Sequence, residues 1–309
     1  MRFLSPLRYP GGKAKLAPFL ERIIGAQTVR PTHYAEPFAG GAGAALKLLQ
    51  IGSVEHIHLN DLNPGIAAFW RVILSETANF VQLVKNTPLD LDEWWRQRAI
   101  YINPDGKEDL ELGFATFYLN RTNRSGILGA RPIGGLSQKG RWKIDARFNR
   151  EGLVERIQKI AGMRSKISIT QFDGLEFLDS LDQYGCKMFV YADPPYIVQG
   201  NGLYLNAFDG ISHLNLANKL SSINCPWLLT YDDVPQVTEE LYSRGRCATF
   251  PIAHTAHKQH VGSESIIFSA NLVVPDMEIA AGRVARWVDM GVDNQTYSGV
   301  FTASGSTNR

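Results

Sequence analysis

Short runs of apolar residues, bounded by Gly, Pro, Asn or Asp, recur along most of the chain. Their length and their lack of alternation fit strands that are buried on both faces of a sheet. We predict six strands from these runs, at residues 33–38, 56–60, 166–172, 186–192, 227–231 and 265–270. Residues 43–50, between the first two, are rich in Ala, Leu and Lys and favour a helix. The chain therefore begins with a strand-helix-strand unit typical of a parallel sheet.

A long interruption separates the second predicted strand from the third. Residues 64–74 favour a helix, and strands resume near residue 166, after a gap of about ninety residues. Within the gap, residues 87–98 and 108–119 are predicted helices. We therefore predict an α/β domain made of residues 1–75 and 163–275, with an inserted, mainly helical domain at 76–162. Residues 276–309 lack strand character and are expected to form a C-terminal extension whose end is mobile.

Positive charge is concentrated in one part of the predicted insertion. The whole chain has a net charge of only +2, whereas residues 121–150 contain eight Lys or Arg and one acid, Asp145, which gives +7. These basic residues are Arg121, Arg124, Arg131, Lys139, Arg141, Lys143, Arg147 and Arg150. The Asn and Gly residues between them are typical of a flexible loop with hydrogen-bonding side chains, so we expect contact with nucleic acid. A basic surface loop without a partner is the alternative on composition alone.

The cysteines and histidines do not indicate a metal site or a disulfide framework. Cys186, Cys225 and Cys247 are odd in number and lack C-x-x-C spacing. His254, His257 and His260 have no carboxylate partner, and we interpret them as a polar loop before the last strand. No apolar run approaches 18 residues and the first ten residues lack the apolar core of a signal peptide, so a cytoplasmic protein is expected.

A Gly-rich turn follows the first predicted strand. Residues 39–43 read A-G-G-A-G and lead into the helix at 43–50, which places backbone amides and a helix N-terminus at the carboxyl end of a strand. Asp61 ends the next strand, about twenty residues later, where α/β nucleotide folds bind ribose hydroxyls. Tight packing explains the glycines equally well, and Asp61 has an alternative role as N-cap of the helix that starts at Pro64.

Asp193-Pro194-Pro195-Tyr196 directly follows the apolar strand at 186–192. The two prolines fix the backbone and remove two N–H donors, so carbonyl oxygens remain as acceptors. A carboxylate beside such a carbonyl can accept two hydrogen bonds from one NH₂ group. Tyr196 adds an aromatic face on which a planar base can stack. The tetrapeptide therefore predicts a site for a planar amine.

These segments together resemble the DNA adenine methylase (Dam) family of N6-adenine methyltransferases, over residues 7–272. The turn Tyr9-Pro10-Gly11-Gly12-Lys13 is similar to the family's aromatic-x-Gly-Gly-Lys motif, and 34–43 resemble its E-P-F-x-G-x-G cofactor loop. Residues 59–63 (L-N-D-L-N) resemble the family's ribose-binding motif. Residues 118–126 resemble the N-R-T-x-x-x-G-like segment of its target-recognition region, and residues 193–196 match its D-P-P-Y motif. The five motifs occur in the family's order.

The resemblance implies a Rossmann-like methyltransferase fold, with a seven-stranded, mostly parallel sheet and an inserted target-recognition domain. It implies S-adenosylmethionine as cofactor, S-adenosylhomocysteine as product, and no metal. The implied cofactor contacts are Tyr9, Lys13, Glu36, Phe38, Gly40, Asp61, Phe172, Asp173 and Asp193. The implied catalytic residues are Asp193, Pro194 and Tyr196. Tyr9 stands where several members carry Trp, and Arg124-Ser125-Gly126 where many have Phe-Asn-Gly, so no GATC target is carried over.

The sequence thus predicts methylation of N6 of a flipped adenine in double-stranded DNA. Asn120, Arg121, Asn123 and Arg124 are the expected base-reading residues, because Arg pairs with guanine and Asn with adenine. Lys139, Arg141, Lys143 and Arg147 are expected on phosphates. A bacterial or phage origin, a companion restriction endonuclease, and a monomer or weak dimer on DNA are compatible with the sequence. The alternatives are methylation of RNA or of a protein glutamine, and a catalytically silent DNA-binding relative.

Overall fold

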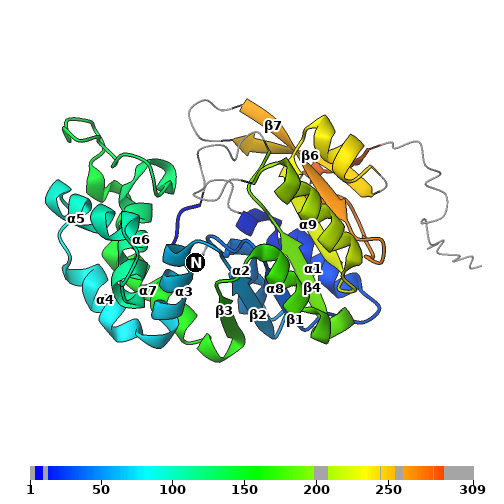
Figure 1. The fold of residues 1–309 in the computed structure, drawn as a ribbon, viewed down its shortest axis with the longest axis horizontal. Coiled ribbons are helices and arrows are strands. Elements are labelled where there is room, and N and C mark those ends of the chain that lie inside the picture. Colours follow the sequence, from blue (N-terminus) through cyan, green and yellow to red (C-terminus); the bar gives the residue numbers. More distant parts are fainter. Residues whose placement is uncertain are drawn as a thin grey trace, which may run out of the picture.

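The computed structural model describes residues 4–9, 13–197, 208–243, 245–254, 260–280 and 282–288. Within these ranges an eight-stranded sheet runs in the order β10-β6-β7-β5-β4-β1-β2-β3 (Figure 1). Its strands are β1 (His33–Glu36), β2 (His56–Asn60), β3 (Ile167–Thr170), β4 (Met188–Ala192), β5 (Trp227–Asp232), β6 (Arg246–His254), β7 (His260–Phe268) and β10 (Arg286–Trp287). β1 to β5 are parallel, while β7 runs antiparallel to both β5 and β6. This order, with its reversed β7, is that of the Rossmann-like methyltransferase fold.

Helices cover both faces of the sheet. Tyr34 of β1 points into a core shared with α1 (Ala17–Ala26), α2 (Gly43–Gln50) and α3 (Pro64–Ser75). Ala35, the next residue, points into the opposite core, which α8 (Gly174–Ser180) and α9 (Gly210–Ser222) close. The four strands β1, β2, β4 and β5 are buried on both faces, and this explains why apolar runs without alternation marked them in the sequence.

The far edge of the sheet differs from the prediction. β6 was not expected, and β7 begins five residues before the predicted strand at 265–270. Beyond residue 275 the prediction of no strands was wrong, because β8 (Glu278–Ala280) and β9 (Arg283–Val284) form a hairpin and β10 pairs with β6. Strands of two or three residues are too short to leave a periodic signal. The predicted mobile end, residues 302–309, lies outside the described residues.

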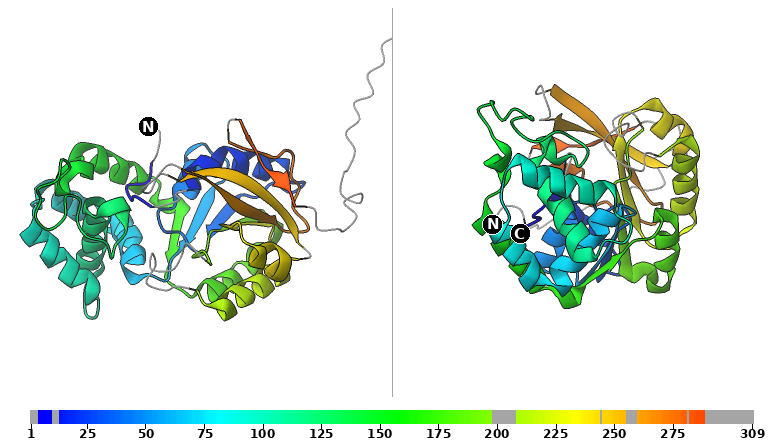
Figure 2. Two further views of the ribbon diagram at one scale, coloured as in Figure 1. Left: turned by 90° about the horizontal axis from the view of Figure 1, so that it is seen from above. Right: turned by 60° about the vertical axis from the view of Figure 1, so that its left-hand side comes forward.

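The interruption in the strand pattern is a group of helices beside the sheet. They are α4 (Thr77–Asn86), α5 (Leu91–Ile102), α6 (Asp109–Thr122) and α7 (Arg150–Ala161), and Figure 2 shows them at one side of the molecule. α3 connects this group to the sheet: a Cβ on Gly113 of α6 would lie 2.9 Å from the backbone of Phe69. Phe69 also stacks on Phe117 of α6, with 5.8 Å between ring centroids. α3 is therefore packed tightly against the insertion.

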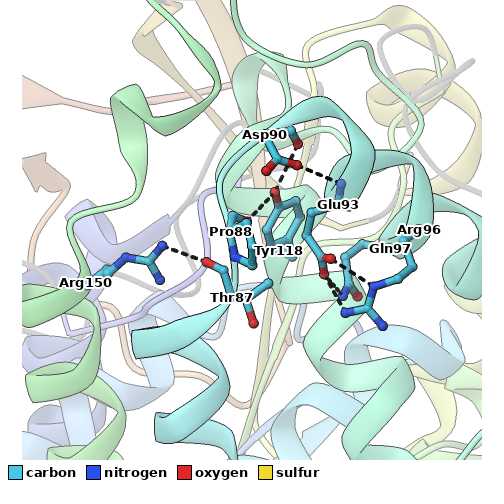
Figure 3. A network of polar contacts seen from close by, with 8 residues as sticks. All are labelled: Thr87, Pro88, Asp90, Glu93, Arg96, Gln97, Tyr118 and Arg150. Carbon is cyan, nitrogen blue, oxygen red and sulfur yellow. Dashed lines mark hydrogen bonds and ion pairs between the residues drawn. The ribbon is translucent and has the colours of Figure 1, made fainter.

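Polar contacts fix the loop between α4 and α5 (Figure 3). The prediction began a helix at residue 87, but Pro88 and Asp90 precede α5, and Asp90 caps it by accepting the Glu93 N–H at 2.9 Å. The Tyr118 hydroxyl donates to the Pro88 carbonyl at 3.0 Å. Arg150, one of the cations of the basic segment, donates to the Thr87 carbonyl at 2.7 Å. That arginine therefore stabilises the insertion itself.

Candidate active site

A cavity of about 520 Å³ opens at the carboxyl ends of β1, β2 and β4, where open α/β sheets bind their ligands. Eight of the nine predicted cofactor contacts line it: Tyr9, Lys13, Glu36, Phe38, Gly40, Asp61, Asp173 and Asp193. Tyr101, Arg121 and Arg156 complete the wall from the insertion. Pro10, Gly11 and Gly12 of the N-terminal motif lie outside the described residues.

The Gly-rich turn after β1 is shaped by a close approach of Tyr9. Gly40 has φ +45°, and a Cβ there would lie 2.7 Å from Cζ of the Tyr9 ring. On its other side, Trp70 of α3 donates to the Gly40 carbonyl at 2.9 Å. A side chain at position 40 would therefore displace the aromatic ring that covers the turn.

Asp61 lies at the tip of β2, inside the cavity. Its carboxylate accepts the Gly40 N–H at 2.8 Å and the Asn63 N–H at 3.0 Å, and burial raises its pKa to about 6. Asn63, whose side chain accepts the N–H groups of Gly65 and Ile66, is the N-cap of α3. The alternative role of Asp61 as helix cap is thus taken by Asn63, and Asp61 remains available to a ligand.

Asn60, which the sequence did not single out, ties two walls of the cavity together. Its amide donates to the carbonyls of Pro37 and Phe172, both at 3.0 Å. Its carbonyl oxygen accepts from the Phe172 N–H at 2.9 Å and the Thr170 hydroxyl at 2.8 Å. One buried side chain therefore fixes the turn after β1 relative to the turn after β3. Phe172 itself is 48% exposed and is not among the described residues that line the cavity, while Asp173 caps α8.

Glu36 is a buried acid beneath the Gly-rich turn. Its Oε1 accepts from the Tyr34 hydroxyl at 3.0 Å and from the Ala45 N–H at 3.1 Å. Burial nevertheless raises its pKa to about 8, so this carboxyl group is mostly protonated at neutral pH. Glu36 connects β1 to the first turn of α2.

Donors converge on one oxygen of Asp193. Oδ1 accepts from the Thr230 hydroxyl at 2.7 Å and the Tyr196 hydroxyl at 3.1 Å, and lies 3.5 Å from Nζ of Lys13. Burial, reinforced by Asp193, raises the pKa of Tyr196 far above its ordinary value, so that its hydroxyl keeps its proton. No described residue bonds to Oδ2. Pro194 is buried, and Pro195 lines the cavity.

Glu264 of β7 is a second residue that the sequence did not reveal. It is 1% exposed and accepts from Nζ of Lys13 at 2.8 Å, while Lys13 also donates to the Tyr196 hydroxyl at 2.5 Å. Burial alone would lower the pKa of Lys13, but Asp193 and Glu264 outweigh it and raise that pKa. One ammonium group therefore faces two carboxylates, so this group of three side chains carries an excess of negative charge.

The sequence profile of the D12 class N6 adenine-specific DNA methyltransferases matches residues 9–260. The chain belongs to this family. The match runs from the Tyr9 that covers the Gly-rich turn to the start of β7, and so includes the cavity and the insertion. Family membership makes the chain an S-adenosylmethionine-dependent adenine methyltransferase.

Solved structures of low similarity were also found. PH1948 of Pyrococcus horikoshii, described as a candidate RNA methyltransferase, is 11% identical with a TM-score of 0.38 over 85% of each chain. The rRNA methyltransferase aviRa of Streptomyces viridochromogenes is 14% identical with a TM-score of 0.37 over 84% of this chain and 86% of that one. Likenesses at this level do not bear on the substrate of the present methyltransferase. No curated protein matches the chain.

Two of the residues predicted to read DNA bases are instead buried within this methyltransferase. The Asn120 amide donates to the carbonyls of Arg8 and Gly126, and its oxygen accepts the Arg8 N–H at 2.7 Å. Asn123 donates to the carbonyls of Ile127 and Leu128 and accepts from the indole of Trp94 at 2.7 Å. Both side chains are 0% exposed, donate both of their amide N–H groups and accept through their oxygen, so the expectation that they face DNA was wrong.

The predicted cations fall into two groups. Arg124, Lys139, Arg141, Lys143 and Arg147 are exposed, as an approach to phosphates or bases requires. Arg121 is mostly buried and donates to the Pro6 carbonyl at 3.4 Å and to the Arg147 carbonyl. The guanidinium of Arg121 therefore lies in the cavity wall beside the backbone of Arg147, and not on the exposed surface.

The described residues contain no group of three or more His, Cys, Asp or Glu side chains arranged to hold a metal ion. His257, and the side chains of His254 and His260, lie outside what the structure describes; the backbone places the last two in β6 and β7 rather than in a loop. No helix among the described residues is long and apolar enough to cross a membrane.

Proposed function

We propose that this methyltransferase acts on an adenine that leaves the duplex and enters the cavity with its N6 amine at Asp193. The single observation that carries the proposal is the arrangement at that carboxylate. Three donors hold Oδ1, and Oδ2 has no partner among the described residues. Since the orientation of Asp193 is fixed by Oδ1, Oδ2 is free to accept an N–H of the amine.

The neighbouring residues suit a planar amine. The Pro194 carbonyl supplies a second acceptor, so that both N–H bonds of N6 are taken up and its lone pair turns toward the methyl donor. We assign the ring of Tyr196, which is anchored through its hydroxyl, as the stacking partner of the base. These groups act by positioning and by electrostatics, without a covalent intermediate on the protein.

The residues around the Gly-rich turn fit S-adenosylmethionine. Asp61 presents a carboxylate for ribose hydroxyls, and the rings of Tyr9 and Phe38 form apolar walls. Only glycine fits at position 40, because a Cβ there would collide with the Tyr9 ring. The excess negative charge of Asp193 and Glu264 over Lys13 is complementary to a sulfonium. When bound, the cofactor supplies an electrophilic methyl group.

The basic segment supplies the face toward DNA. We assign phosphate contacts to the exposed residues Lys139, Arg141, Lys143 and Arg147, and a base contact to Arg124. Arg141 lies over the exposed Trp142 ring at 5.3 Å, which holds this cation on an apolar support.

Transfer of a labelled methyl group to duplex DNA, with RNA and protein glutamine as parallel acceptors, tests the function. Label in N6-methyladenine of DNA is expected; label only in RNA or protein would refute the DNA assignment. Asp193→Ala should lower kcat on the order of 10²-fold or more while calorimetry still detects cofactor binding. Glu176→Gln, an exposed change on α8, is the control. Absence of cofactor binding by the unaltered protein would favour a silent DNA-binding relative.

A further inference from the structure

Four arginines gather where the insertion meets the N-terminal segment. Arg8 comes from that segment, Arg121 from α6, Arg147 from the turn before α7, and Arg156 from α7. Arg8, Arg121 and Arg156 line the same cavity as Asp193. Within the described residues none of the four forms an ion pair with a carboxylate. We call this group the four-arginine cluster.

The guanidinium groups of Arg8, Arg121 and Arg156 are held by neutral partners only. They donate to main-chain carbonyls, those of Ser5, Pro6, Asn123 and Arg147. The Nε atoms of Arg121 and Arg156 and the hydroxyl of Ser5 are buried without a hydrogen-bond partner in the described structure. Native proteins rarely leave buried donors unpaired, and such groups mark positions where a ligand can bind.

Mutual repulsion within the cluster is substantial. Burial, followed by the charges of Arg8, Arg156 and Arg147, lowers the pKa of Arg121 to about 9. Burial and Arg147 likewise lower the pKa of Arg8. Like charges that are held together away from water disfavour the free state, and a bound anion would relieve that repulsion.

We propose that the four-arginine cluster binds a backbone phosphodiester of the DNA strand, next to the nucleotide whose base reaches Asp193. The proposal rests on the proposed function, since it takes nucleic acid as the substrate. Arg121 and Arg147 belong to the same segment as the exposed cations placed on phosphates, and Arg156 follows on α7, so a strand lying on that segment leads into the cluster. Planar guanidinium groups match the paired oxygens of a phosphodiester. The carboxylate of the cofactor is the other anion of this size in the cavity.

Neutral linkages in the DNA test the site without altering the protein. A methylphosphonate placed in turn at each phosphate flanking the target adenine removes one charge at a time. One of these linkages is expected to weaken DNA binding by the unaltered protein roughly tenfold or more. Arg156→Gln should weaken binding of unmodified DNA by a similar factor and reduce the slope of log K against log salt by about 1. The methylphosphonate that weakens binding by the unaltered protein should cause no further loss of affinity in Arg156→Gln.

Controls separate the possible outcomes. Arg156→Lys keeps the charge and should retain most of the salt slope, and Arg164→Gln, an exposed change beyond α7, should leave binding unaltered. If every neutral linkage near the adenine leaves affinity unchanged, the proposal is wrong. If Arg156→Gln weakens cofactor binding in calorimetry and not DNA binding, the anion is the cofactor carboxylate and the proposal is equally wrong. Failure of the unaltered protein to methylate DNA would instead overturn the proposed function.

Discussion

Replacing Glu36 by Gln is expected to stabilise the protein, by an amount that grows with pH. The side chain is 5% exposed, and its Oε1 accepts the Tyr34 hydroxyl and the Ala45 N–H. A glutamine oxygen can accept both of these hydrogen bonds in the same position. The substitution therefore removes the ionisable proton while leaving the two contacts in place.

The magnitude follows from the pKa of Glu36, which burial raises from 4.5 to about 8. Below pH 4.5 the carboxyl group is neutral in the folded and the unfolded chain, so its stabilising contribution is complete there. As the pH rises, the unfolded chain ionises first and this contribution is lost, by about 1.4 kcal/mol per pH unit. The loss ends above the folded pKa, near pH 8, and totals on the order of 5 kcal/mol.

Urea unfolding of both proteins at roughly pH 5, 7 and 9 measures this difference. The free energies of unfolding should be similar at the lowest pH and diverge as the pH rises, with the variant more stable. Glu176→Gln, which removes an exposed carboxylate from α8, controls for the loss of one acid. Parallel profiles for the unaltered protein and Glu36→Gln would refute the argument that Glu36 is neutral in the folded state.

Three further predictions address other parts of the molecule. Gly126 has φ +78°, and a Cβ there would lie 2.2 Å from the Arg8 carbonyl oxygen. Gly126→Ala should therefore lower the free energy of unfolding, measured in urea, by about 2 kcal/mol or more. Gly129→Ala, which has open space around it, is the control and should leave that free energy unchanged. Burial raises the pKa of Asp61 to about 6, so cofactor affinity measured by calorimetry should fall below that pH, and Asp61→Asn should abolish this pH dependence. Burial, with the neighbouring histidines, lowers the pKa of His58 from 6.5 to about 4. The contribution of neutral His58 to stability should therefore be lost as the pH falls from 6.5 to 4. In His58→Phe, the free energy of unfolding should depend less on pH across this range.

The central strands were predictable because burial on both faces leaves a continuous apolar run. β2 has the predicted bounds, residues 56–60. β1 ends two residues before the predicted end at residue 38, because Pro37 cannot donate a hydrogen bond to the neighbouring strand. β6 was missed although it has nine residues, since Pro251 and polar positions interrupt its sequence. Its place in the sheet depends on pairing with β7 along its whole length, and such a pairing leaves no mark in a local window.

Motifs located the parts of the site that are contiguous in sequence. Asp61, Lys13 and Asp193 stand in recognisable segments, and all three line the cavity. Glu264 could not be found in this way, because its role depends on a lysine 251 residues away. Asn120 and Asn123 were misread for a related reason. An asparagine between cations looks the same in the sequence whether its side chain faces DNA or donates to buried carbonyls. Only the fold distinguishes these two roles.

The buried Asn120 connects the loop at Gly126 to the segment that covers the Gly-rich turn. Asn120 bonds both the N–H and the carbonyl of Arg8, and also the Gly126 carbonyl within the loop. Tyr9, the next residue, lies against Gly40 so closely that no side chain fits between them. Because backbone geometry links Arg8 to Tyr9, a shift of the loop at Gly126 must either break these hydrogen bonds or move the ring over the Gly-rich turn. The position of this loop and the shape of the Gly-rich turn are therefore mechanically dependent.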